Sequence, residues 1–181
     1  MNLNPSNKDL VKRCIQGDRY AQFDLYKQYS RAMFNICLRM LKSRDEAEDA
    51  LQISFVDVFK NLEKYRYEAS LGSWIKRIVI NNCLTALKKR KMHFESIEEG
   101  HIQIADEDHA RDNGMSELSV AQVKSALSEL PDGYRTVFTL YLFEGYDHQE
   151  ISEILEISEA TSKSQFSRAK KKMRQLLEES I

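Results

Sequence analysis

The chain has 181 residues, 42% of them hydrophobic and 30% charged, which excludes a disordered chain and fits one folded domain or two small ones. Its six glycines and two prolines leave long periodic runs of apolar and polar residues with few turns, so we predict an all-α fold. The first ten residues lack an apolar signal-peptide core, and no run of about 18 apolar residues occurs, so we expect a cytoplasmic protein without membrane insertion.

The formal net charge of −1 hides a strong separation of charge along the chain. Cations cluster at 88–91 and 170–172, whereas acids cluster at 45–49 and between 95 and 117. Local fields steer binding, so a neutral sum does not exclude a nucleic-acid partner. The three cysteines form no CxxC pair, and we expect them to be buried apolar residues rather than disulfides or metal ligands.

Apolar periodicity predicts three helices in the first part of the chain, over residues 3–16, 20–41 and 45–63. The third helix begins with four acids, Asp45, Glu46, Glu48 and Asp49. Acids favour a helix N-terminus, and that is the simpler reading. Four acids in five residues exceed what capping needs, so a basic partner surface is the alternative reading.

A short loop, YRYEAS at 65–70, precedes a fourth predicted helix over 73–91. Aromatic residues here lie close to cations and amides, a combination that suits single-stranded nucleic acid because bases stack and phosphates need neutralising. Large aromatic side chains more often fill cores, so interior packing is the favoured reading for Trp74.

Residues 93–115 break the helical pattern and are rich in acids, which predicts a flexible acidic linker. His93, His101 and His109 fall in this stretch, but their spacing fits no metal-ligand template. We therefore expect no metal site, no cofactor and no catalytic residues in the chain.

Helices resume at residue 116, turn at 131–133 and continue over 134–144, with Gly145 as a candidate C-cap. The last stretch, 147–174, reads as two short helices with a tight joint at 156–158 and Ser158 as the second N-cap. The outer face of the second helix carries cations and small hydroxyl side chains. This pattern predicts a helix-turn-helix that reads a major groove, with a solvated amphipathic hairpin as the alternative.

Three segments together resemble the extracytoplasmic-function (ECF) group of bacterial RNA polymerase sigma factors. DEAEDALQISFVDVF is similar to the helix that grips the polymerase clamp. YRYEASLGSWIKRIVINNCLTALKKRK is similar to the segment that melts and reads the minus-ten element. The stretch from Leu127 to Met173 is similar to the domain that reads the minus-thirty-five element. The resemblance covers nearly the whole chain.

The resemblance implies two small helical domains, a clamp-binding and melting domain at 4–92 and a helix-turn-helix domain at 116–181, joined by the linker at 93–115. It implies polymerase contacts from Asp45, Glu48, Asp49 and Gln52. It implies contacts to the melted element from Tyr65, Tyr67, Glu68, Ala69, Ser70, Asn81, Lys88, Lys89 and Arg90. It implies contacts to the upstream element from Thr161, Lys163, Ser164, Ser167, Arg168 and Lys171.

Core RNA polymerase and promoter DNA are the implied partners, an anti-sigma factor is a further candidate, and we expect a monomer when the protein is free. The linker of 23 residues reaches at most about 75 Å, whereas two DNA turns measure roughly 70 Å, so one chain can bind two separated elements.

Three positions depart from the family pattern. Glu156 stands where glycine is usual, Ser162 where an apolar residue is usual, and Ile53 where glutamate is frequent.

A stand-alone helix-turn-helix regulator is the alternative function. Such proteins usually dimerise to match two half-sites, and no dimerisation helix is evident in the sequence. An enzyme acting on nucleic acid is disfavoured because no nucleophile–base pair, phosphate-binding loop or metal-ligand set occurs.

Overall fold

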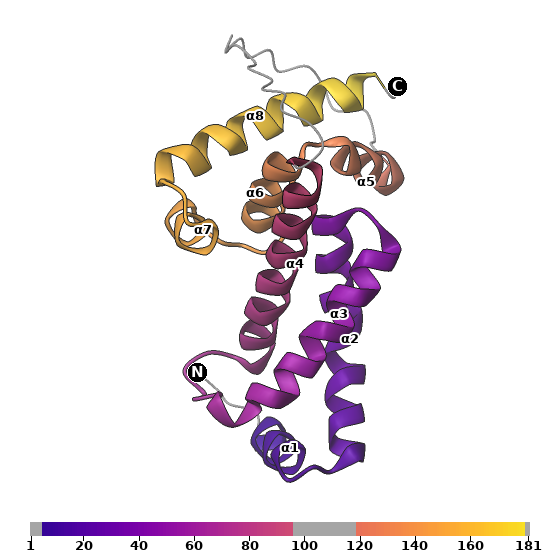
Figure 1. The fold of residues 1–181 in the computed structure, drawn as a ribbon, viewed down its shortest axis with the longest axis vertical. Helices are drawn as coiled ribbons and strands as arrows, with labels where there is room; N and C mark the ends of the chain where they lie inside the picture. Colours follow the sequence, from indigo (N-terminus) through magenta and orange to yellow (C-terminus); the bar gives the residue numbers. More distant parts are fainter. Residues whose placement is uncertain (1–4, 96–118, 180–181) are drawn as a thin grey trace. The chain divides into compact units, whose positions relative to one another are not determined.

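The structure is a computed structural model that describes residues 5–95 and 119–179. The described residues contain α-helices, one short 3₁₀ helix and no strand (Figure 1). The helices are α1 Pro5–Ile15, α2 Arg19–Leu41, α3 Arg44–Asn61, η1 Leu62–Lys64, α4 Leu71–Glu95, α5 Val120–Glu129, α6 Asp132–Leu142, α7 His148–Leu155 and α8 Glu159–Glu178. The all-α prediction is confirmed.

Contacts divide the chain into two compact units, Met1–Leu87 and Lys88–Ile181. The predicted linker at 93–115 lies outside the described residues except for its first three, which continue α4. Its bounds, and with them the domain bounds 4–92 and 116–181, stay predictions.

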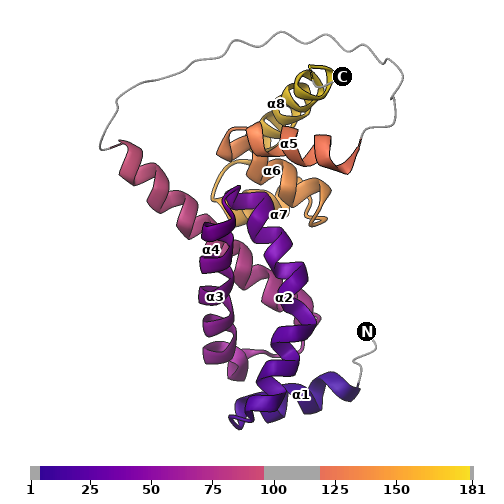
Figure 2. The ribbon, with the colours of Figure 1, turned by 90° about the vertical axis from the view of Figure 1, so that its right-hand side faces the viewer.

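The first unit is built on α2 and α3, which pack side by side (Figure 2). Fully buried side chains come from α2, α3 and α4: Leu25, Cys37, Met40, Val58, Ile75, Val79 and Cys83. All three cysteines are free and buried, as the sequence predicted. Burial raises the pKa of Cys14 to about 11, and a hydrogen bond with Cys37 together with burial raises the pKa of Cys83. These thiols therefore stay protonated and act as packing groups.

A polar link fixes α4 against α3 in this core. Asn82 Nδ2 donates to Asp57 Oδ2 at 3.0 Å and to Ser54 Oγ at 3.3 Å. Ser54 is fully buried, and its hydroxyl donates to the Ala50 carbonyl at 2.6 Å. Hydrogen bonds are directional, so this link sets which side of α4 faces α3.

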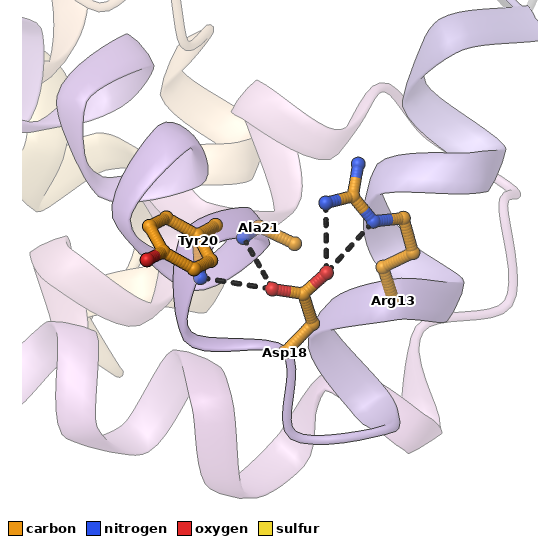
Figure 3. A network of polar contacts seen from close by, with 4 residues as sticks. All are labelled: Arg13, Asp18, Tyr20 and Ala21. Carbon is orange, nitrogen blue, oxygen red and sulfur yellow. Dashed lines mark hydrogen bonds and ion pairs between the residues drawn. The ribbon is translucent and has the colours of Figure 1, made fainter.

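The turn between α1 and α2 is held by a single carboxylate (Figure 3). Asp18 Oδ1 accepts from the backbone N–H groups of Tyr20 and Ala21, which caps α2. Its Oδ2 accepts from the Arg13 guanidinium at 2.7 and 2.9 Å. The hydrogen bond from Arg13, followed by those from the backbone, lowers the pKa of Asp18. The charged carboxylate is therefore the form that holds this turn.

The second unit packs α5, α6 and α8 around a small core made of Ala126, Leu127, Leu130, Phe138, Ala169 and Met173. Arg135 is fully buried in this unit. Its guanidinium donates to the Leu130 carbonyl at 2.7 Å and to Asp132 at 2.6 Å. These bonds satisfy the charge that burial would otherwise make costly.

The predicted turn at 131–133 is wrong in its extent. Pro131 is the N-cap residue, and α6 already begins at Asp132. An acid in the first helical turn is favourable, and the bonds from Arg135 tie this start to the end of α5. Gly145 has a φ of +76° and follows the C-cap Phe143, so it completes the exit from the helix without being its cap.

Candidate nucleic-acid and polymerase interfaces

The helix-turn-helix joint is defined by caps on both of its helices. Asp147 and Glu150 form a reciprocal capping box at the start of α7. The helix ends at Glu156, which has the left-handed backbone angles φ 57° and ψ 41°. Ser158 then accepts the Thr161 N–H at 3.0 Å and starts α8, so the predicted N-cap is confirmed. Figure 1 shows α7 at the N-terminal end of α8.

The α8 helix has two chemically different sides. Ser162, Ala169 and Met173 are buried. Most of the side chains predicted to read the upstream element lie on the opposite side and are exposed: Lys163, Ser164, Ser167, Arg168 and Lys171. The remaining one, Thr161, is half-buried at the edge of this side. This sequence-predicted set therefore shares one surface, which we call the α8 face.

Part of the α8 face is already engaged within the helix. Lys163 Nζ lies 2.7 Å from the Glu159 carboxylate, and both groups are more than half exposed. Such exposed pairs contribute little to stability, so this ion pair holds the Lys163 side chain only weakly. Ser164 Oγ donates to the Thr161 carbonyl at 3.0 Å.

The loop at 65–70 is organised by one buried tyrosine. Tyr65 is 7% exposed, and its hydroxyl donates to the Ala69 carbonyl at 2.6 Å. Burial raises its pKa. The Tyr67 ring lies 4.6 Å from the Tyr65 ring, and Tyr67 has a positive φ of 61°. Tyr65 therefore supports the loop from inside, whereas Glu68, Ala69 and Ser70 are exposed.

The helix that follows presents a stripe of polar and aromatic groups, which we call the α4 stripe. Trp74, Asn81 and Lys88 recur every seven residues, so they share one side of α4. Asn81, Lys88 and Lys89 are exposed, whereas Trp74 and Arg90 are half-buried. Interior packing therefore accounts for only part of Trp74, whose ring lies 5.4 Å from that of Tyr65. Trp74 and Lys88 are separated by roughly 20 Å of helix rise.

The start of α3 forms a surface of acidic and amide side chains, which we call the α3 surface. Asp45, Asp49 and Gln52 are exposed, and Glu48 is half-buried with an ion pair to Arg44 at 2.8 Å. Two apolar side chains that our sequence analysis did not assign to a partner surface extend it, Ile53 at 55% and Val56 at 50% exposure. Their signal was present in the sequence, because both fall out of phase with the inward apolar stripe of this helix.

Within the described ranges, no group of three or more His, Cys, Asp or Glu side chains is placed to hold a metal ion. His101 and His109 lie outside those ranges. No described helix is both long enough and apolar enough to span a membrane.

The residues of the α3, loop, α4 and α8 surfaces lie in two segments of the chain that match known protein families. Residues 25–92 match Sigma-70 region 2, and residues 121–173 match Sigma-70, region 4. The chain is 30% identical over 172 residues to the ECF RNA polymerase sigma factor SigM of Mycobacterium tuberculosis, covering 95% of this chain and 85% of that protein. The chain belongs to the ECF RNA polymerase sigma factors.

Other comparisons agree with this sigma-factor assignment. ECF sigma factor SigW of Bacillus subtilis is 27% identical over 179 residues, covering 94% of this chain and 96% of SigW. Among solved structures, sigma factor RpoE in complex with the anti-sigma factor NepR from Bartonella quintana has a TM-score of 0.60 at 20% identity, covering 86% of this chain and 95% of RpoE. CnrH in complex with the cytosolic domain of CnrY has a TM-score of 0.57 at 20% identity, covering 95% and 97%. These two structures share the fold of this sigma factor.

Each predicted site lies wholly inside one of the two family matches. The α3 surface, the loop and the α4 stripe lie inside the region 2 match. The whole α8 face lies inside the region 4 match.

Proposed function

We propose that this sigma factor directs core RNA polymerase to promoters through three separate surfaces. The α3 surface, Asp45, Glu48, Asp49 and Gln52, binds the polymerase. The loop and the α4 stripe hold melted minus-ten DNA. The α8 face reads the minus-thirty-five element. All three act in the cytoplasm, where polymerase and chromosome meet.

The α8 face is the observation that carries this proposal. Cations and hydroxyls are exposed on one side of the helix, and the other side is buried in the second unit. Cations neutralise phosphates, and hydroxyl and guanidinium groups donate to base edges. A helix of this kind presented by a capped partner helix is the arrangement that enters a major groove.

The loop and the α4 stripe support strand melting. Extruding a base from the stack costs a few kcal/mol, so a protein that melts DNA by binding alone must repay this cost with stacking and hydrogen bonds. Trp74 and Tyr67 offer rings, Asn81 offers an amide, and Lys88 and Lys89 offer charge. We therefore propose that the protein acts by binding rather than as an enzyme, without a cofactor.

An anti-sigma factor is a proposed further partner. One structure of similar fold, RpoE of Bartonella quintana, was solved with the anti-sigma factor NepR. The two units of the present chain each expose surfaces that a protein inhibitor would need to cover to block polymerase or DNA.

Reconstituted transcription tests the proposal. The full chain is added to sigma-free core polymerase on genomic DNA, and transcript 5′ ends are mapped. Transcripts from a common promoter pattern are expected, whereas the absence of specific transcripts on any template would contradict the proposal.

The Asp49→Arg variant separates a sigma factor from a stand-alone regulator. Reversing an exposed charge on the α3 surface should abolish polymerase binding, because a basic partner would then meet a cation. Asp24→Arg is the matched control, since Asp24 is an exposed acid on α2 outside the three surfaces. Co-purification with core polymerase is the measurement. Unchanged polymerase binding by Asp49→Arg would favour the stand-alone regulator.

A further inference from the structure

A buried hydroxyl lies on the inner side of α8, opposite the α8 face. Ser162 is fully buried, between Thr161 and Lys163 in the sequence. This position departs from the family pattern, in which an apolar residue is usual. Ser162 Oγ forms a side-chain hydrogen bond across the joint with His148 Nδ1, at 2.9 Å.

His148 lies on α7 and contacts both α6 and α8. It is the first residue of α7. Its ring stacks on Tyr141 of α6 at 4.6 Å and 21°. The same ring makes an edge-type contact with Phe166 of α8, with centroids 5.6 Å apart. Tyr141 and Phe166 also touch each other, with centroids 4.4 Å apart. The imidazole is therefore the place where α6, α7 and α8 meet.

The ring contacts and the hydrogen bond of the imidazole constrain the orientation of α8 to different degrees. Ring contacts hold α8 close, but aromatic pairs are favourable over a broad range of distances and tilts, so they tolerate a small rotation or slide of a helix. A hydrogen bond loses strength steeply when its angle or length changes. Within this cluster, the His148–Ser162 pair is thus the contact that sets the rotation of α8 about its axis.

We propose that His148 and Ser162 are positioning residues that align the α8 face for reading base edges. This inference rests on the proposed role of α8 in upstream-element recognition. Base-edge contacts need aligned donors and acceptors, whereas phosphate contacts tolerate displacement because they act mainly through charge. Loss of the pair should therefore reduce discrimination between DNA sequences more than it reduces affinity for DNA in general.

The experiment measures sequence discrimination by the full-length protein bound to core polymerase. The preferred upstream element is first selected from a random duplex library with the wild-type holoenzyme. The ratio of Kd values for the scrambled and the selected duplex is then measured for Ser162→Ala and His148→Phe. The first variant removes the hydroxyl, and the second keeps an aromatic ring but removes Nδ1.

Two further variants sharpen the test. His148→Asn keeps a hydrogen-bonding group near the position of Nδ1 and should restore part of the discrimination that His148→Phe loses. Ser152→Ala is the matched control, because the Ser152 hydroxyl donates to Gln149 within α7 and does not cross the joint. Melting temperatures are recorded for every variant, so that a general loss of stability is seen separately.

We expect Ser162→Ala and His148→Phe each to lower the Kd ratio about 3- to 10-fold, the range that one net hydrogen bond accounts for. The double variant should lose no more than either single variant, because the two side chains act through one bond. Ser152→Ala should keep the wild-type ratio.

Either of two results would overturn the inference. One is a wild-type Kd ratio in both single variants. The other is an equal loss of affinity for selected and scrambled duplexes that follows the melting temperature. A wild-type holoenzyme that selects no upstream sequence would instead refute the proposed role of α8, before any variant is compared.

Discussion

At the residue scale, one of two adjacent side chains can pack inside the protein while the other is exposed at a proposed binding surface. Asn82 turns inward and bonds to Asp57 and Ser54, and its neighbour Asn81 is exposed on the α4 stripe. Successive residues on a helix point about 100° apart, so the amide of Asn82 anchors the helix and the amide of Asn81 lies on the surface that we propose binds melted DNA. Ser162 and Lys163 repeat this division on α8, where the first is buried and the second is exposed.

A residue-scale prediction distinguishes two cations of the α8 face. Arg168→Ala should weaken binding to the selected promoter by about 1–3 kcal/mol if the guanidinium makes a bidentate base contact. Lys171→Ala should lower affinity for all sequences alike and flatten the salt dependence, as expected of a phosphate contact. Kd values on selected and scrambled duplexes at several salt concentrations provide the measurement. Equal losses on every sequence for both variants would contradict the distinction.

At the element scale, the joint between α7 and α8 works against local backbone preference. Glu156 adopts the left-handed conformation, which residues with a side chain adopt at a cost because Cβ crowds the following carbonyl. The caps at Asp147 and Ser158 and the packing of α8 against α6 hold the conformation in place. The tight turn is therefore imposed by its flanking helices.

Relieving this strain gives an element-scale prediction. Glu156→Gly should raise the free energy of unfolding by about 0.5–1 kcal/mol, because glycine adopts a positive φ without a Cβ penalty. Glu156→Asn is the control for loss of charge, since asparagine also tolerates this conformation. Chemical denaturation followed by circular dichroism provides the measurement. A Glu156→Gly variant less stable than the wild type would show that Glu156 makes a contact worth more than the strain.

At the scale of the whole molecule, one chain carries the three proposed surfaces, one each for polymerase, for a melted strand and for a duplex. The α3 surface and the loop belong to the first unit, and the α8 face belongs to the second. Tethering turns binding of the second element into an intramolecular step with a high effective concentration. The 23 residues at 93–115 are the predicted tether.

The length of this tether gives a whole-molecule prediction. Removing residues 98–109 leaves 11 linker residues with a reach of at most about 36 Å, well below the roughly 70 Å of two DNA turns. The shortened holoenzyme should bind a two-element promoter no better than a promoter with one element intact. A Gly/Ser replacement of equal length is the control, and it should keep the gain in affinity for the two-element promoter over the one-element promoter. Kd values on one- and two-element promoters provide the measurement, and an undiminished gain in the shortened chain would contradict the prediction.

Much of the fold followed from local signals in the sequence. Helix periodicity and capping residues act within a few positions, so the joint at Glu156 and the cap at Ser158 were predictable, and the helix bounds differ by only a few residues from those observed. The turn at 131–133 was overextended because the bonds of Arg135 that tie the start of α6 to α5 depend on the folded packing.

The sequence by itself determined the all-α class, the family and the charged faces, because these depend on residue order and helical period. Only the tertiary structure decided that Tyr65 supports its loop from within, that Asn82 anchors α4, and that Ser162 bonds to His148 across the joint. Asn82 and its partner Asp57 are 25 positions apart in the sequence, and His148 and Ser162 are 14 positions apart. Contacts at such separations depend on how helices pack, and no local pattern encodes them.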